Sequence, residues 1–147
     1  MRRVENQLYG GLLHAEAHAA ATSPARPWDL AAFQGRNYCL VVSFRRNGEP
    51  VVTPVWFGVA GGRLYFRTDA EAGKVKRIRR TPRVRIAPCT ARGRPLAPPV
   101  EGVARILDES GSVAAEKALR DNYGLGRRVY ERLLAAGKAV YLEVGQS

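Results

Sequence analysis

Several residues and motifs on which enzymes commonly depend are scarce or missing in this sequence of 147 residues. It contains only two histidines, His14 and His18, and only two cysteines, Cys39 and Cys89. The patterns GxSxG, GxGxxG, GxxxxGK[ST] and HExxH do not occur, so the hydrolase, dinucleotide, P-loop and zinc-protease sites that they mark are not expected. Both histidines lie in a weakly patterned N-terminal stretch, which argues against a histidine-dependent triad.

Long apolar runs are also missing. No run approaches the roughly 20 residues that a membrane-spanning helix needs, and no signal-peptide pattern is present, so we expect a cytoplasmic protein. The two cysteines lie on apolar, strand-like runs without zinc-type spacing, which favours buried free thiols. His14 and His18 would share a helix face, but nothing nearby completes a metal site, and surface positions are favoured over a metal pair.

Acidic residues are few. The chain has 13 Asp and Glu against 24 Lys and Arg, a formal net charge of +11. Nine of the cations and no acid fall between residues 73 and 94. This imbalance calls for an anionic partner, which could be nucleic acid, an anionic membrane surface, or a small molecule that carries phosphate or carboxylate groups.

Strand-like runs dominate what is present. We expect a helix over residues 1–21 that is broken at 22–27, and a short helix at 28–33. Strands are predicted at 38–45, 49–59, 63–68, 83–88, 100–107 and 139–144, with further helices at 69–80, 113–123 and 127–136. Asn-Gly at 47–48 and Gly-Gly at 61–62 indicate hairpin turns. This order predicts one mainly β domain, a small six-stranded β-barrel with flanking helices.

The candidate site lies between residues 50 and 94. Pro54 interrupts an otherwise good strand and cannot donate a ladder hydrogen bond, so residues 53–56 are expected at an edge or a bulge. The backbone amides there could face a ligand, or the proline could simply protect an exposed edge from aggregation. Trp56 could flank a flat ring, or it could be an ordinary core aromatic.

A basic helix follows the third strand. Asp69 is a plausible N-cap, and Val75 and Ile78 are spaced to form the buried face. The cations around the helix could hold phosphate or carboxylate oxygens by charge-assisted bonds, or they could form a solvated basic face. They are Lys74, Lys76 and Arg77, with the hydroxyls of Thr53 and Thr68 as further donors. Since no acid pair is evident, an enzyme built on this chain would take its reactive group from a cofactor.

These parts together resemble a known family. The runs NGEPVVTPVWFGVAGGRLYFRT (residues 47–68) and AGKVKRIRRTPRVRIAPCTARGRPLAPPVEGVARIL (residues 72–107) resemble the split β-barrel flavin/deazaflavin oxidoreductases. The nearest likeness is to the pyridoxamine-5′-phosphate-oxidase-like class that uses coenzyme F420. The resemblance covers residues 38–107. It leaves residues 1–27 as an N-terminal helical extension to a barrel domain of residues 28–147.

The resemblance implies a homodimer with two cofactor sites in grooves at the subunit interface. Carried over position by position, Thr53, Pro54, Val55 and Trp56 would lie against the deazaflavin ring. Arg67 and Thr68 would lie near the ribityl phosphate, and Lys74, Lys76 and Arg77 would hold the phosphate and the acidic tail. The resemblance implies no metal, and it assigns no catalytic residue.

The function so implied is transfer of a hydride between reduced F420 and a conjugated small molecule. F420 carries a phosphate and a γ-glutamate tail, so it would use more of the nine cations than FMN, which has one phosphate. An FMN-binding oxidase or reductase, or an F420-binding protein without turnover, are the alternatives. A nucleic-acid-binding module is least favoured, because residues 74–94 lack the interleaved aromatics of a stacking platform.

Overall fold

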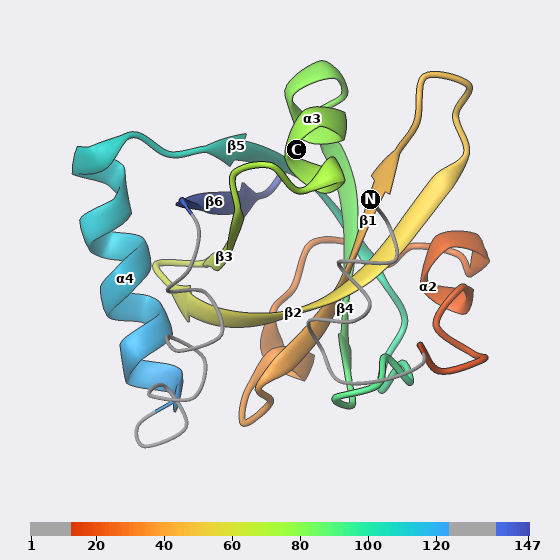
Figure 1. Ribbon diagram of the computed structural model, residues 1–147. Coiled ribbons are helices and arrows are strands. Elements are labelled where there is room, and N and C mark those ends of the chain that lie inside the picture. Colours follow the sequence, from red (N-terminus) through yellow and green to blue (C-terminus); the bar gives the residue numbers. More distant parts are fainter. Residues whose placement is uncertain (1–12, 124–137) are drawn as a thin grey trace.

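The computed structural model describes residues 13–123 and 138–147, and six strands form a closed antiparallel barrel in it (Figure 1). The order around the barrel is β1-β2-β3-β6-β5-β4, so the last strand closes the barrel between β3 and β5. The strands are β1 (Tyr38–Phe44), β2 (Pro50–Ala60), β3 (Arg63–Asp69), β4 (Arg83–Cys89), β5 (Val100–Ile106) and β6 (Ala139–Gly145). The mainly β architecture and all six predicted strands are confirmed.

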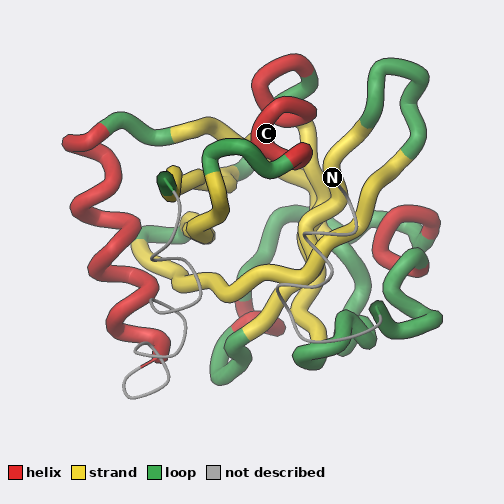
Figure 2. Tube along the Cα trace, in the orientation of Figure 1, coloured by secondary structure: helices red, strands yellow, loops and turns green. Residues whose placement is uncertain are grey.

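The helices lie outside the strands (Figure 2). They are α2 (Ala19–Thr22), the 3-10 turn η1 (Ala31–Phe33), α3 (Gly73–Arg80) and α4 (Glu109–Tyr123). In the view of Figure 1, α4 and α2 lie on opposite sides of the barrel. Helix α4 packs on β2, β3 and β6, α2 on β1, β2 and β4, and α3 on β1 and β5. Among the described residues, no helix is long and apolar enough to cross a membrane.

The helix boundaries differ from the sequence prediction in three places. Of the N-terminal helix expected over residues 1–21, the described part contains only α2. Helix α4 begins at Glu109 rather than near Val113, because Asp108 Oδ1 accepts hydrogen bonds from the Ser110 hydroxyl and the Gly111 amide, both at 2.9 Å. These bonds lower the pKa of Asp108, and the bond from the Gly111 amide has the largest effect. The helix expected at 127–136 lies outside the described residues.

The third difference concerns Asp69. The prediction that this residue is the N-cap of the helix was wrong. Helix α3 begins at Gly73, and its N-cap, Ala72, makes no side-chain cap. The carboxylate of Asp69 instead accepts a hydrogen bond from the Glu71 amide at 2.8 Å. An aspartate can close such a local turn ahead of a helix as readily as it can cap the helix itself.

The barrel strands bury side chains on two faces, as expected where strands alternate their side chains. One cluster fills the barrel interior and includes Val41, Val55, Phe57, Phe66 and Ile78. A second cluster lies outside β1, β2 and β4, where α2 covers it; its members include Leu40, Val42, Ala17 and Ala20. Strand β1 is therefore buried on both faces, which explains its nearly unbroken apolar sequence.

The ladder between β2 and β3 is incomplete. β3 pairs with residues 57–60 of β2, whereas residues 50–56 pair with β1 alone in the described chain. Pro54 lies in this edge segment, opposite Leu40 of β1. The edge predicted from Pro54 is therefore confirmed: residues 57–60 of β2 close the barrel with β3, while residues 50–56 form an open edge.

Candidate functional site

The edge segment of β2 (residues 50–56) presents its side chains alternately to two faces. Val55 belongs to the interior cluster, and Thr53, two residues earlier, therefore points the same way. Thr53 is only 2% exposed, and its Oγ1 is buried without a hydrogen-bond partner among the described residues. A buried hydroxyl is normally bonded, so an unsatisfied one calls for an explanation such as a ligand.

Helix α3 buries two of its cations. Lys74 is 1% exposed and Arg77 is 8% exposed, and they share the buried face with Val75 and Ile78. The prediction that these two cations surround the polar side of the helix was therefore wrong. Of the three predicted anion-holding residues of the helix, only Lys76 is exposed.

Both buried cations meet hydroxyl groups of the barrel. Lys74 Nζ donates to Thr68 Oγ1 of β3 at 3.3 Å. Arg77 Nε donates to Ser43 Oγ of β1 at 2.7 Å. Thr53 is paired with Val41 in the β1–β2 register, on the same face as Ser43. We refer to these five residues as the α3 cluster: Ser43, Thr53, Thr68, Lys74 and Arg77.

The α3 cluster has the chemistry of an anion site. An ammonium and a guanidinium, both withdrawn from water, give stronger charge-assisted hydrogen bonds than exposed cations would. Hydroxyl groups can donate or accept, so the Thr53 hydroxyl can turn its proton toward an incoming oxygen. The residues present therefore fit a phosphate or carboxylate group.

The other predicted site residues lie elsewhere. Trp56 is half-buried on the opposite face of β2, where its ring meets Tyr38 edge-on at 5.7 Å between centroids. Pro54 alternates with Thr53 and lies on that opposite face too. Arg67 leaves β3 on the outer face, with its guanidinium 5.5 Å from the ring centre of Tyr141. Val55 shares the face of Thr53 but is fully buried in the core.

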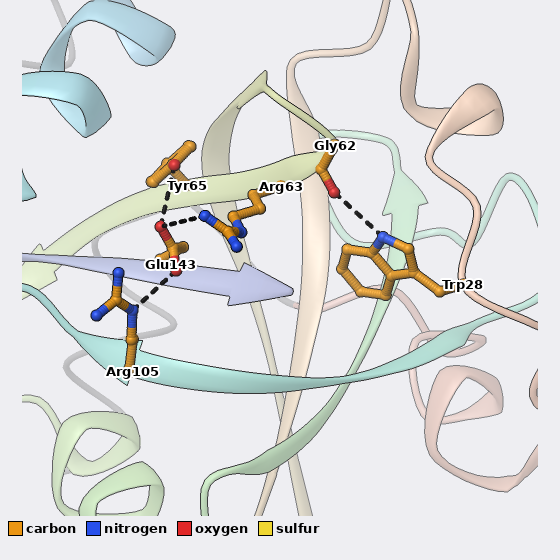
Figure 3. A network of polar contacts seen from close by, with 6 residues as sticks. All are labelled: Trp28, Gly62, Arg63, Tyr65, Arg105 and Glu143. Atoms are coloured by element: carbon orange, nitrogen blue, oxygen red, sulfur yellow. Dashed lines mark hydrogen bonds and ion pairs between the residues drawn. The ribbon is translucent and has the colours of Figure 1, made fainter. Parts of the chain in front are cut away.

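Two features were missed from the sequence. Ser43 was not predicted as a site residue, although its place on the inner face of β1 follows from the alternation of that strand. The second is a polar network on the outer face of β3, β5 and β6, centred on the carboxylate of Glu143 (Figure 3). It brings together residues that are far apart in the sequence, and no local pattern indicates it.

The Glu143 network is well bonded. Its Oε1 accepts from Arg105 Nε at 2.8 Å, and its Oε2 accepts from the Tyr65 hydroxyl at 3.0 Å and lies 3.9 Å from Arg63 Nη1 (Figure 3). The bond from Arg105 does most to lower the pKa of Glu143, against the opposing effect of burial. Burial, with the bond to Glu143, raises the pKa of Tyr65. Because its members come from β3, β5 and β6, this network ties these strands together.

Concavities of the described chain lie away from the α3 cluster. One of about 260 Å³ is bounded by Leu30, Phe33, Phe57 and Asn122, among others. Another of about 620 Å³ lies between Trp28 and Glu143. Neither is lined by a residue of the α3 cluster, so these two cavities of the described residues are separate from the cluster.

The cysteines do not add reactivity. Both are buried free thiols, as predicted. Burial raises the pKa of Cys89 to about 12 and also raises that of Cys39, so neither forms a thiolate readily. Among residues 13–123 and 138–147, no group of three or more His, Cys, Asp or Glu side chains could hold a metal ion.

Solved structures share this fold at low sequence identity. A heme-binding protein from Mycobacterium smegmatis aligns with a TM-score of 0.58 at 17% identity, over 91% of this chain and 52% of that one, so this chain spans about half its length. HutZ, the heme storage protein of Vibrio cholerae, aligns with a TM-score of 0.60 at 9% identity, over 83% of this chain and 92% of that one. A pyridoxamine 5′-phosphate oxidase-related, FMN-binding protein from Nostoc punctiforme aligns with a TM-score of 0.52 at 14% identity, over 91% of this chain and 81% of that one.

Sequence comparison gives the family. No curated protein matches the chain significantly. The family model for pyridoxamine 5′-phosphate oxidase matches residues 29–138, which is most of the chain and all of the barrel up to β6. The incomplete β2–β3 ladder and the interior hydroxyls and cations all lie within the matched residues. This chain belongs to the pyridoxamine 5′-phosphate oxidase family.

Proposed function

We propose that this protein is an F420-dependent oxidoreductase that works as a homodimer. The observation that carries the proposal is the α3 cluster, in which Lys74 and Arg77 are buried beside the hydroxyls of Thr68 and Ser43. Two buried cations concentrate positive charge where water screens it little, and hydrogen bonds to charged groups are strong in such a place. That charge would attract an anionic group held between α3 and the open edge of β2.

When bound, a reduced deazaflavin supplies the hydride, which together with a proton saturates an activated double bond of a conjugated small molecule. In this proposal Lys74 and Arg77 hold the cofactor's phosphate, and the Thr53 and Thr68 hydroxyls complete its hydrogen bonds. The edge segment of β2 offers backbone amides to the ring, since β3 does not cover them. The contribution of these residues is to bind and orient.

F420 is favoured over FMN by the distribution of charge along α3. The phosphate would occupy the buried face, while Lys76, Arg79 and Arg80 remain exposed on the same helix. A γ-glutamate tail brings further carboxylates that these exposed cations would attract. FMN would leave them without such a role. An FMN-binding oxidase or reductase is the second candidate, favoured by the same buried cations.

The dimer is proposed because residues 50–56 of β2 have no second strand neighbour among the described residues. A partner subunit that covers this open edge would complete a groove. The half-buried Trp56 beside Pro54 would then meet the partner or the ring. Sedimentation velocity should give twice the chain mass of 16.1 kDa. A monomer that binds the cofactor at full affinity would contradict this part of the proposal. We expect the dimer in the cytoplasm, where free thiols stay reduced.

Hydride transfer tests the activity. The protein is mixed with reduced F420 and, in turn, with quinones, enones and nitroaromatic compounds, and the return of oxidised F420 absorbance is followed. Acceptor-dependent oxidation above the protein-free rate is expected. Tight binding of F420 without oxidation for any acceptor would instead favour a cofactor-binding protein without turnover.

A further inference from the structure

A second arginine follows β1 on the face that carries Ser43 and Thr53 of the α3 cluster. Arg45 follows the last residue of β1, and its amide donates to the Glu49 carbonyl at 2.9 Å, which extends the β1–β2 ladder by one more pair. Residues two apart in a ladder point to the same face. Arg45 therefore leaves the backbone on the inner face, beside Ser43.

The Arg45 side chain has an unsatisfied donor. Its Nη2 atom is buried and has no hydrogen-bond partner among residues 13–123 and 138–147. Leaving a buried polar group unbonded costs about 1–3 kcal/mol, and more when the group is charged. The Thr53 hydroxyl, on the same face of the neighbouring strand, is buried and unbonded in the same way. Two unsatisfied groups on one face indicate a common missing partner.

Ser43 is two residues before Arg45 on the same face of β1, and it contacts the arginine of α3. Its hydroxyl accepts the 2.7 Å bond from Arg77 Nε, and it is 1% exposed. A bond to Nε fixes the plane of the guanidinium, so its terminal nitrogens keep one direction. Arg45 and Arg77 thus come to the inner face at Ser43 from β1 and from α3. Guanidinium forks of this kind bind phosphate and carboxylate oxygens in pairs.

We propose that Arg45 and Arg77 form an anion subsite at the junction of β1 and α3, with Ser43 as the residue that positions Arg77. The inference rests on the proposed function, since the anion is a phosphate or carboxylate group of the bound cofactor. It assigns β1 a direct role in binding, beside the contributions of β2, β3 and α3.

A pair of neighbouring arginines provides the test. Arg45→Gln removes the inner guanidinium, and Arg46→Gln removes an exposed one on the adjacent residue, with the same loss of charge. Fluorescence titrations with F420, FMN and riboflavin compare the two variants with the wild type. We expect Arg45→Gln to weaken F420 binding about 10-fold or more and Arg46→Gln to weaken it less than 3-fold. Riboflavin, which has no anionic group, should bind both variants alike.

The same titrations identify the group that is bound. If Arg45→Gln weakens the binding of both F420 and FMN, the subsite holds the phosphate. If it weakens the binding of F420 alone, the subsite holds the tail carboxylates. Equal losses for Arg45→Gln and Arg46→Gln, or an equal loss for riboflavin, would overturn the proposal. Ser43→Ala should weaken binding of the anionic ligands, and Ser43→Thr, which keeps the hydroxyl, should restore it.

Inorganic pyrophosphate separates this inference from the proposed function. Pyrophosphate should raise the melting temperature of the wild type and of Arg46→Gln but not that of Arg45→Gln, whichever flavin the protein uses. If no flavin binds but this pattern holds, the proposed function fails and the subsite stands. If F420 binds tightly and the two variants still respond alike to pyrophosphate and to F420, the subsite fails and the function stands.

Discussion

Among single residues, Lys74 is the one on which the proposed anion site depends most. A buried lysine is uncommon, and this one reaches across to β3 to donate to Thr68. In its charged form it has three donors that would suit a phosphate oxygen, and its burial would protect such a bond from competition with water. Lys76, two residues further along the helix, is exposed and would make weaker, screened contacts.

We predict that Lys74→Met weakens F420 binding about 10- to 100-fold, because one charge-assisted hydrogen bond contributes about 1.5–3 kcal/mol. Methionine keeps the length of the side chain, and a thermal melt checks that the variant folds. The matched control is Lys117→Met, which removes an exposed lysine of α4 that pairs with Asp121 in its own helix. Wild-type affinity in Lys74→Met would show that the anion binds elsewhere.

Glu143 is expected to make the stability of the fold depend on pH. Its pKa is lowered in the folded state, chiefly by the Arg105 bond. The stabilisation is therefore present above the ordinary glutamate pKa of about 4.3 and is lost as the pH falls through the lower folded value. Glu143→Gln should cost about 1–3 kcal/mol at pH 7 and should flatten the decline in stability between pH 5 and pH 2.

Urea unfolding across this pH range measures both effects. The exposed Glu49, replaced by glutamine, is the control and should leave the curve nearly unchanged. Asp108, whose pKa is also lowered, remains in both variants and sets the residual slope. A parallel decline in wild type and Glu143→Gln would contradict the role given to the network.

At the scale of elements, close packing of α4 on β2 depends on Gly58. A Cβ at this position would clash with the backbone carbonyl of Ala118 in α4. A clash with backbone cannot be relieved by turning a side chain, so the helix would have to move. The same contact surface includes Asn122, whose Nδ2 donates to the Phe57 carbonyl at 2.7 Å.

Gly58→Ala should therefore destabilise the fold by about 1–3 kcal/mol or more, as overpacked sites do. Gly111→Ala makes the same chemical change within α4, where the nearest atoms to the added methyl are side-chain atoms of Leu107 and Asp108 at 3.2–3.4 Å rather than backbone. Since alanine favours helix, that control should be neutral or slightly stabilising. Thermal melts decide, and equal melting temperatures for the two variants would contradict the close packing.

The strands and helices also show how much of the structure could be predicted from the sequence. Strand positions followed from alternation and turn residues, and the edge followed from Pro54, since these are local signals. A helix was predicted where α3 lies, although it begins at Gly73 rather than at residue 69, and the burial of Lys74 and Arg77 was not foreseen. A long cationic side chain on an amphipathic helix normally extends to water, and only the positions of Thr68 and Ser43 on distant strands turn these two inward.

At the scale of the whole molecule, the closed barrel brings α3 over strands that are distant in sequence. β6 closes the barrel by pairing with β3 and β5, so Glu143 meets Tyr65 and Arg105. Such contacts follow from topology, which a single sequence does not specify. The overall charge of +11 predicts an anionic partner, while the fold determines which cations are buried.

The most direct measurement is a fluorescence titration of the purified wild-type protein with oxidised F420 and, in parallel, with FMN. We predict selective and tight binding of F420, with an affinity that falls as ionic strength rises, because exposed cations of α3 contribute through screened attraction. Binding of FMN alone would contradict the deazaflavin assignment and favour a flavin oxidase or reductase. Binding of neither ligand would contradict the central claim that the α3 cluster holds a flavin-type cofactor.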